Sequence, residues 1–513
     1  MNIDVAIIGS GHNALVAATY LARAGLDVHL FERRDTLGGA TLNEELWPGY
    51  TFSTGAHLLH ALPAQLVREL GLAAHGLSMV PRDEVIYLNR DGTYHTNLDF
   101  DLPHHATARA KLSADELAGL QRYDAFKQTL LSFLRPWLLT VPPGDEELRR
   151  AAAGTPAEEV LRLATGMRLW ELQDHFLPTA RLRERVAAEG SAFACNPGAF
   201  CLAYGAIDWP DPATGEKGPW GFVRGGMGRL AAALAASARQ AGATLHTGCP
   251  VQTITVQDGR ATGLLLENGE TVAARLVLST ADPKRTFLRL LAPGHVEAGL
   301  RRRIDALNSH VSCYKFLAAI DELPQWRGWD GDPGLPHRGS VQLEINRESI
   351  RRIYAEVEAG QPPARPMMSF NLPSMLDASL APPGRHTASV YVYSAPAKLA
   401  ADTWDERREE VAGRLIDQIT DYAPNFRRSI LHYELRTPLD LERKLALTDG
   451  CIWHLQHTPE QLLGHRPLRE LSRYRAPIAG LYLGGSGQHP GGEVSGIPGH
   501  NAAKEMLKDL QLA

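Results

Sequence analysis

The first residues with a chemical pattern are small ones near the start of the chain. They form the sequence Gly9-x-Gly11-x-x-Ala14, and the residues between them are Ser10, His12 and Asn13. The first glycine permits a tight turn from a strand into a helix, the second lets the backbone approach a phosphate, and the small third residue lets the helix pack on the strand. Because free N–H groups and the helix dipole attract anions, the pattern predicts a dinucleotide diphosphate at this turn.

An acidic residue follows where the ribose of a nucleotide is expected. Glu32 stands 23 residues after Gly9 and can accept hydrogen bonds from both ribose hydroxyls. Its charge would repel a 2′-phosphate, so the site disfavours NADP. Beyond Glu32 and Arg33, the run Leu37-Gly38-Gly39-Ala40 resembles the one found in flavoproteins with a two-dinucleotide-binding domain. This run favours FAD over NAD as the ligand.

A strand–helix–strand unit must hold these residues in place. Residues 4–8 are apolar and β-branched, residues 15–24 are rich in alanine and leucine, and residues 27–31 form a second apolar run that ends at Glu32. The unit has the length of a βαβ motif, about 30 residues. Two Asx-Gly turns within residues 251–279 predict a β-meander further along the chain.

The composition excludes several classes of protein. The chain has 513 residues, of which 44% are hydrophobic and 22% charged, which suits two to four globular domains. A formal charge of −5 argues against a general nucleic-acid binder, and five scattered cysteines argue against a disulfide framework. No apolar run approaches the ~20 residues that span a bilayer. We expect a cytoplasmic protein, with peripheral membrane contact left open at the apolar residues 130–141.

Longer stretches along the whole chain resemble one group of flavoproteins. The stretches that carry the resemblance are residues 9–18, 224–228, 281–283, 380–384, 421–424, 481–492 and 495–503. In these the chain is similar to the phytoene desaturase-like FAD oxidoreductases, a branch of the amine oxidase superfamily. Within that branch it is most similar to the desaturase-type carotenoid ketolases and the pyridine nucleotide-disulphide oxidoreductase domain 2 proteins.

The resemblance implies a non-covalent FAD and the residues that contact it. The ADP half would lie on the N-terminal turn, with Val251 beside the adenine. The segment around Gly55 and Ala56 would approach the flavin ring from one side. The glycine-rich C-terminal loop would cover the ring from the other, and the helix after it would point its N-terminus at the flavin. The loop residues implied in this contact are Gly485, Ser486, Glu493 and Val494.

The resemblance also implies the fold. It is an α/β fold with a Rossmann-type two-dinucleotide FAD-binding domain and a discontinuous α+β substrate-binding domain. The FAD-binding domain is expected in residues 1–84, 217–305 and 445–513. The substrate-binding domain is expected in residues 85–216 and 306–444, with a mostly helical insertion.

Two positions of the C-terminal loop depart from the family pattern. Gln488 stands where relatives usually carry threonine, and Glu493 stands where they usually carry glycine or another small or apolar residue. A carboxylate over the flavin is unexpected for an enzyme that handles a pure hydrocarbon. In a partly dry site the pKa of Glu493 would tend to rise, which would make it a proton donor or acceptor near neutral pH.

Three further side chains are candidates for contact with a substrate or a proton. Lys315 interrupts an apolar strand, where an amine needs a partner and its pKa falls. His57 follows the segment expected near the flavin, and His489 lies in the C-terminal loop; an imidazole at either place could orient substrate or shuttle a proton. Each also has a structural explanation: an ion pair or a snorkelling side chain for Lys315, and a purely structural role for each histidine.

Three other patterns in the chain resemble functional motifs, but their sequence context argues against a metal site, a serine hydrolase or a redox cysteine pair. His454-x-x-His457 has no cysteine or carboxylate at ligand spacing, so no metal site is predicted. Ser312-x-x-Lys315 lies in a strand, whereas the serine hydrolases with this motif place it at the start of a helix. Cys195 and Cys201 lie far from the first helix, where a flavin-linked redox pair would stand.

The function predicted from these observations is FAD-dependent oxidation. The enzyme would take a hydride from a C–H bond of a largely apolar, isoprenoid or carotenoid-like substrate, in a desaturation or ketolation. With a single dinucleotide motif in the chain, oxygen or a quinone would accept the electrons. The alternatives are a flavin amine or amino-acid oxidase that acts on a more polar substrate, and a non-catalytic FAD-binding scaffold.

Overall fold

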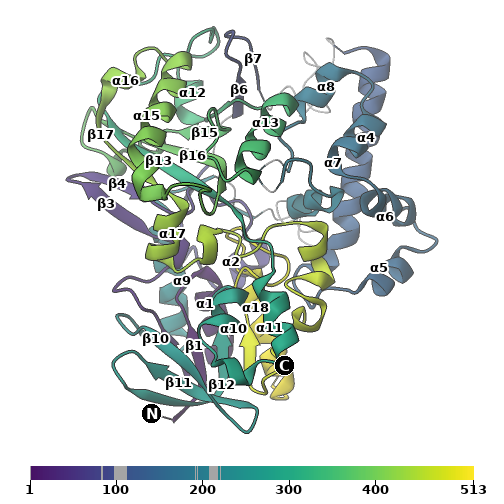
Figure 1. The fold of residues 1–513 in the computed structure, drawn as a ribbon, viewed down its shortest axis with the longest axis vertical. Coiled ribbons are helices and arrows are strands. Elements are labelled where there is room, and N and C mark those ends of the chain that lie inside the picture. The colour runs from purple at the N-terminus through teal and green to yellow at the C-terminus, as the bar shows by residue number, and fades with distance from the viewer. Residues whose placement is uncertain are drawn as a thin grey trace.

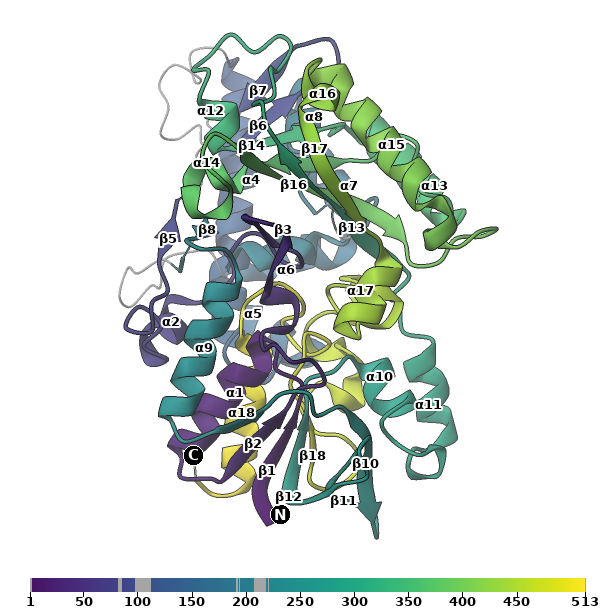
Figure 2. The same cartoon turned by 90° about the vertical axis from the view of Figure 1, so that its left-hand side faces the viewer.

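Two sheets, one above the other, organise the molecule (Figures 1 and 2). The computed structural model describes residues 2–81, 85–96, 112–190, 192, 194–206, 218–219 and 221–512. Within these residues each of the two sheets has seven strands. The lower sheet in Figure 2 contains the first strand of the chain, and the upper sheet is built mainly from the second half of the chain.

The lower sheet has a parallel centre and an antiparallel edge. Its order is β10-β11-β12-β1-β2-β9, and β18 also pairs with β12. The strands are β1 (Asn2–Ile8), β2 (Val28–Phe31), β9 (Thr244–His246), β10 (Val251–Gln257), β11 (Arg260–Leu266), β12 (Thr271–Ser279) and β18 (Leu481–Leu483). The predicted βαβ unit and β-meander are both confirmed, since β1 and β2 are parallel and β10, β11 and β12 are antiparallel.

Helices cover both faces of the lower sheet (Figure 2). They are α1 (His12–Arg23), α9 (Gly228–Gln240) and α18 (Ile497–Asp509) on one face, and α10 (Pro283–Leu288) and α11 (Ala298–Asp305) on the other. Successive residues of β1 point to opposite faces, so Val5 and Ile7 join the first core and Ala6 and Ile8 the second. This burial on both sides explains the continuous apolar sequence of the strand.

One face of the upper sheet packs against a long helix. The strand order of this sheet is β17-β13-β16-β15-β14-β6-β7. The strands are β17 (Ile430–Arg436), β13 (Val311–Ile320), β16 (His386–Pro396), β15 (Met368–Asn371), β14 (Ser340–Leu343), β6 (Val85–Leu88) and β7 (Tyr94–Thr96). Tyr314 and Phe316 pack with helix α15 (Trp404–Tyr422) in one core. The alternate residues of β13, including Lys315, therefore lie on the opposite face, toward the lower sheet.

A helical segment stands beside the two sheets (Figure 1). It holds α4 (Ala114–Leu134), α5 (Asp145–Ala152), α6 (Ala157–Gly166), α7 (Leu169–Phe176) and α8 (Ala180–Arg185), as predicted. Leu130, Leu131 and Leu134 are buried, so the apolar sequence at the end of α4 belongs to the interior, and membrane contact there stays a prediction. Among the described residues, every helix is too short or too polar to cross a bilayer.

Candidate functional site

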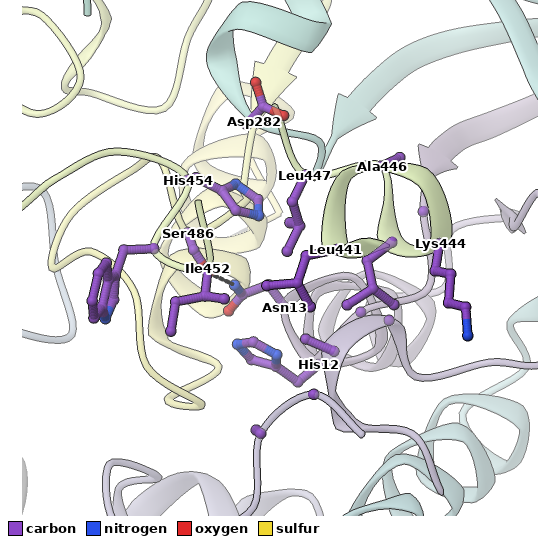
Figure 3. A pocket seen from close by; sticks show the side chains of 18 of the residues that line it. His12, Asn13, Asp282, Leu441, Lys444, Ala446, Leu447, Ile452, His454 and Ser486 are labelled. Carbon is purple, nitrogen blue, oxygen red and sulfur yellow. Dashed lines mark hydrogen bonds between the residues drawn. The ribbon is translucent and has the colours of Figure 1, made fainter. Parts of the chain in front are cut away.

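A cavity of ≈ 780 Å³ extends from the turn after β1 to the face of the upper sheet opposite α15. The predicted cofactor and catalytic residues that line it are residues 9–13, 32–33, 39–40, 55–57, Val251, Lys315, Ser486 and 493–494. Figure 3 shows part of this lining, with His12, Asn13 and Ser486 close together. One cavity thus collects residues from both ends and the middle of the chain.

The glycine turn leaves room for a diphosphate. Gly9 has a φ of +93°, which its tight turn requires. Gly11 is the N-cap of α1, and no side chain caps this helix, so its first N–H groups stay available for an anion. A Cβ placed on Gly11 would meet no atom within 4 Å, although Gly11 lines the cavity. The turn is therefore an open cradle that a side chain at this position would fill.

Glu32 is held in the orientation that a ribose partner needs. One carboxylate oxygen accepts hydrogen bonds from the Ser10 backbone N–H (3.0 Å) and the Ser10 hydroxyl (2.6 Å). The other accepts from the Arg34 N–H (2.9 Å). A carboxylate has about four acceptor positions, so capacity remains for a ligand hydroxyl. The residues present therefore fit the adenosine diphosphate half of FAD.

Three predicted cofactor residues do not line the cavity. Ala14 is completely buried, as close packing of α1 on the sheet requires. A Cβ on Gly38 would lie 2.7 Å from the Ala231 Cβ, and a Cβ on Gly485 would lie 2.4 Å from the Thr280 carbonyl oxygen. These residues therefore shape the cavity by being small, and they do not form its wall.

A buried arginine holds the C-terminal loops that border the cavity. Arg466 is completely buried, and its guanidinium donates hydrogen bonds to the backbone carbonyls of Gln456, Gln461, Trp453, Leu455 and Ser486, at 2.8 to 3.3 Å. Trp453 and Ser486 line the cavity, and Ser486 accepts a hydrogen bond from Asn13 (3.2 Å; Figure 3). Sequence reasoning missed Arg466, because a single arginine in a loop carries no recognisable pattern.

Lys315 reaches from the upper sheet to the segment that was predicted to approach the flavin. Its Nζ donates hydrogen bonds to the carbonyls of Ser53 (2.6 Å) and Gly55 (2.9 Å), and the side chain is almost completely buried. Burial lowers the pKa of Lys315 to about 7. The amine can therefore gain or lose a proton near neutral pH, at a place where it lines the cavity.

We predict that Lys315→Met removes a rise of stability with pH. The pKa of Lys315 is about 7 in the folded chain and 10.5 in the unfolded one, so between these values the unfolded state binds more protons and the folded state gains stability as pH rises. From pH 7 to 9.5 the free energy of unfolding of the native protein should rise by on the order of 3 kcal/mol relative to Lys315→Met. Urea denaturation with saturating FAD measures this. Lys398→Met, at an exposed position, should show the same change of unfolding free energy with pH as the native protein. If the curves of unfolding free energy against pH for Lys315→Met and the native protein are parallel, the lowered pKa of Lys315 is contradicted.

Glu493 has a strained backbone and a held side chain. Its φ is +70°, in the left-handed region that favours glycine. A carboxylate oxygen lies 3.4 Å from His60 Nε2, and the Trp453 indole donates a hydrogen bond to the same carboxylate. Both partners line the cavity with Glu493. Sequence reasoning missed His60, which stands in an ordinary loop sequence.

The expected rise in the pKa of Glu493 is wrong. Burial does raise it, but the hydrogen bond and charge of His60, with the hydrogen bond from Trp453, outweigh burial and hold the pKa of Glu493 below its ordinary value. The group is therefore a carboxylate at neutral pH. It can bind a hydrogen-bond donor or a cation, and it is not a proton donor in this state.

The predicted histidines occupy different environments. The ring of His57 lines the cavity and stacks on Tyr391, with 5.6 Å between the centroids. His489 lies outside the cavity lining, where its Nε2 is 2.9 Å from the Trp137 carbonyl and burial lowers its pKa to about 4. This placement gives a substrate role of His489 no support. Among the described residues, no group of side chains, His454 included, has the arrangement of a metal site.

Comparisons with known proteins agree with this geometry. Residues 15–506 match the family described as flavin containing amine oxidoreductase. Pyridine nucleotide-disulfide oxidoreductase domain-containing protein 2 of Mus musculus is 33% identical, with 99% of this chain and 94% of that protein covered. Hydroxyneurosporene desaturase of Cereibacter sphaeroides is 26% identical, with 99% and 98% covered. The structure of cyclohexylamine oxidase from Brevibacterium oxydans IH-35A has a TM-score of 0.59 at 16% identity over the whole of both chains, which shows a shared fold.

The family predicted from the sequence is confirmed at the level of the superfamily. The matched residues begin at Leu15, within α1 and just after the open turn, and they include most of α18, which covers the same side of the lower sheet. The α/β fold and the FAD cofactor follow from the same match. The carotenoid branch stays a prediction, because the desaturase relative is distant. The chain belongs to the flavin containing amine oxidoreductases and is an FAD-dependent oxidoreductase.

Proposed function

We propose that the chain oxidises a C–H bond of a small organic substrate that carries a polar group near that bond. FAD, when bound, supplies the acceptor for a hydride or its equivalent. The turn after β1, Glu32 and the C-terminal loop would hold the cofactor. The FAD-binding domain would comprise residues 1–84, 217–305 and 445–513, and the substrate-binding domain residues 85–216 and 306–444.

The observation that carries the proposal is the left-handed backbone of Glu493. A non-glycine residue in this conformation costs roughly 1–2 kcal/mol, and such strain persists where the surrounding structure requires it. Here the side chain is fixed by His60 and Trp453 and lies on the cavity wall. Glycine at this position would avoid the cost of the left-handed backbone. That a glutamate stands here instead favours a function for its carboxylate. Its charge suits a substrate with a hydroxyl, an amine or another hydrogen-bond donor.

Lys315 would handle a proton on the other side of the cavity. Its amine is fixed by two carbonyls of the Ser53–Gly55 segment and has a pKa near 7, so it can accept or release a proton close to neutral pH. His57 and Tyr391 would form an aromatic wall beside it. These side chains would help to keep water away from the reacting bond.

Desaturation or ketolation of a largely apolar isoprenoid is the second candidate. It is favoured by a relative over nearly the whole chain that is named hydroxyneurosporene desaturase. The amine oxidase alternative is a special case of the first proposal, with the amine as the polar group near Glu493. In each case oxygen or a quinone would accept the electrons, since the sequence has a single dinucleotide motif.

Anaerobic reduction of the bound flavin tests the proposal. The FAD-loaded protein is mixed with three panels: carotenoid hydrocarbons, isoprenoid alcohols and primary amines. We expect loss of the flavin absorbance near 450 nm, roughly halved or more within a turnover, with compounds of the alcohol or amine panel. Reduction by the hydrocarbons alone would favour the second candidate. No reduction by any panel, with intact FAD, would support the scaffold alternative.

We predict that Glu493→Gly slows flavin reduction by the polar substrate at least about tenfold, because a charge-assisted contact of about 1.5–3 kcal/mol is lost. FAD should stay bound, and the free energy of unfolding should change by less than about 1 kcal/mol, since relief of the left-handed strain offsets the lost hydrogen bonds. Stopped-flow absorbance and urea denaturation measure the two effects. Asp258→Gly, at another left-handed residue in an exposed turn, is the matched control and should leave the rate unchanged. An unchanged rate in Glu493→Gly would remove the argument for a polar substrate.

A further inference from the structure

Polar side chains stand in one row on the cavity-lining face of the upper sheet, opposite the face that packs on α15. Lys315 on β13 pairs with Tyr391 on β16, Tyr391 with Ser369 on β15, and Ser369 with Gln342 on β14. Residues opposite one another on neighbouring strands project from the same face. All four line the cavity. A row of polar side chains thus crosses four strands of a sheet whose other face is an apolar core.

The far end of this row has unused hydrogen-bonding capacity. Gln342 Nε2 donates to the Ser369 hydroxyl oxygen (2.9 Å), and Asn371 Nδ2 donates to the same oxygen (3.2 Å). The hydroxyl oxygen of Ser369 is thus an acceptor in both bonds, and its own hydrogen stays available. In the part of the chain that the structure describes, Gln342 Oε1 has no hydrogen-bond donor. The pair therefore presents one O–H donor and one carbonyl acceptor to the cavity.

The position and charge of the pair restrict its ligand. Three strand spacings separate Gln342 from Lys315, a distance of about 14 Å. Lys315 contacts the Gly55 segment, so the Gln342 end of the row is the end remote from the reaction. Gln342, Ser369 and Asn371 are all neutral and buried. A carboxylate or an ammonium would lose its hydration here without an opposite charge, which disfavours both.

We propose that Gln342 and Ser369 form a substrate subsite for a neutral group that both donates and accepts a hydrogen bond, a hydroxyl or an amide. The group would donate to Gln342 Oε1 and accept from the Ser369 hydroxyl. It would lie at the end of the substrate remote from the oxidised C–H bond. This inference rests on the proposed function, which decides which end of the substrate lies near Lys315. It adds the chemical class of the group at the opposite end of the substrate.

Binding without turnover tests the subsite. The FAD-loaded protein is titrated anaerobically with decane, 1-decanol and decanamide, and the dissociation constants are taken from the perturbation of the flavin absorbance. We expect 1-decanol, decanamide or both to bind about five- to tenfold more tightly than decane, as one or two neutral hydrogen bonds allow. The alcohol and the amide distinguish the two forms of the polar group.

Variants assign the preference to the two residues. Gln342→Leu keeps the volume of the side chain and Ser369→Ala removes only the hydroxyl; each should bring the alcohol and amide to within about twofold of decane. Ser389→Ala is the matched control, because Ser389 lies on the same sheet outside this cavity lining and should keep the preference. FAD content and circular dichroism confirm that each variant is folded.

Two results would overturn the subsite. One is equal or absent binding of all three compounds to the native protein, and the other is a preference that survives in both Gln342→Leu and Ser369→Ala. Failure of the proposed oxidation is a separate result. It would appear as tight, Gln342-dependent binding with no flavin reduction by any panel of substrates.

Discussion

Gly11→Val is expected to give a folded protein that contains no FAD. A Cβ at this position meets no atom within 4 Å apart from its chain neighbours, so we expect the substitution to leave the packing of the described residues intact. The valine side chain would instead occupy the open cradle at the start of α1, where the diphosphate must approach the backbone. We expect FAD affinity to fall by at least about a thousandfold, the equivalent of about 4 kcal/mol.

The control for this variant is another N-cap glycine. Gly144 caps α5 with a φ of −78° and a ψ of 166°, close to the −62° and 168° of Gly11, and a Cβ there also meets no atom within 4 Å. Gly144→Val therefore reproduces the cost of a β-branched N-cap without touching the cavity. Absorbance spectra give the FAD content, and circular dichroism with thermal unfolding gives the fold. Normal FAD content in Gly11→Val would place the diphosphate elsewhere.

The cofactor cradle could be predicted because its determinants are local in sequence. The spacing of Gly9, Gly11 and Ala14 reflects one turn, and Glu32 follows at the end of the next strand. The spacing of the apolar residues around this turn indicates a strand, a helix and a second strand, which leaves few alternative folds for the segment. The same holds for the β-meander, whose two Asx-Gly turns fix the pairing of β10, β11 and β12.

The opposite wall of the cavity could not be predicted, because it depends on register between distant strands. Gln342, Ser369 and Tyr391 become neighbours only when β14, β15 and β16 pair as they do. The same is true of His60, whose partner Glu493 lies at the other end of the chain. For this reason the predicted direction of the pKa shift of Glu493 was wrong. Burial could be foreseen from the sequence, whereas the compensating His60 and Trp453 contacts could not.

Arg466 gives the largest expected effect on stability. Its guanidinium satisfies five backbone carbonyls inside the protein, in the loops that carry Trp453 and Ser486. In Arg466→Met these carbonyls stay buried and lose the guanidinium donor. The Gln456 carbonyl keeps a hydrogen bond from the Gln461 side chain (2.9 Å), and each buried carbonyl that is left unsatisfied costs about 1–3 kcal/mol. We expect the free energy of unfolding to fall by at least about 3 kcal/mol. FAD content should fall with it, because both loops border the cofactor cavity.

Two further variants separate the hydrogen bonds of Arg466 from its charge. Lysine keeps the charge but has three donors on a single nitrogen, so it cannot reach carbonyls on both sides as the planar guanidinium does. Arg466→Lys should therefore recover less than half of the stability lost in Arg466→Met. Arg469→Met removes a neighbouring arginine whose side chain is 69% exposed and should cost at most about 1 kcal/mol. Thermal unfolding and FAD release are measured on all three. Full recovery by lysine would mean that the buried charge, and not the geometry of the five hydrogen bonds, holds the C-terminal loops over the cofactor.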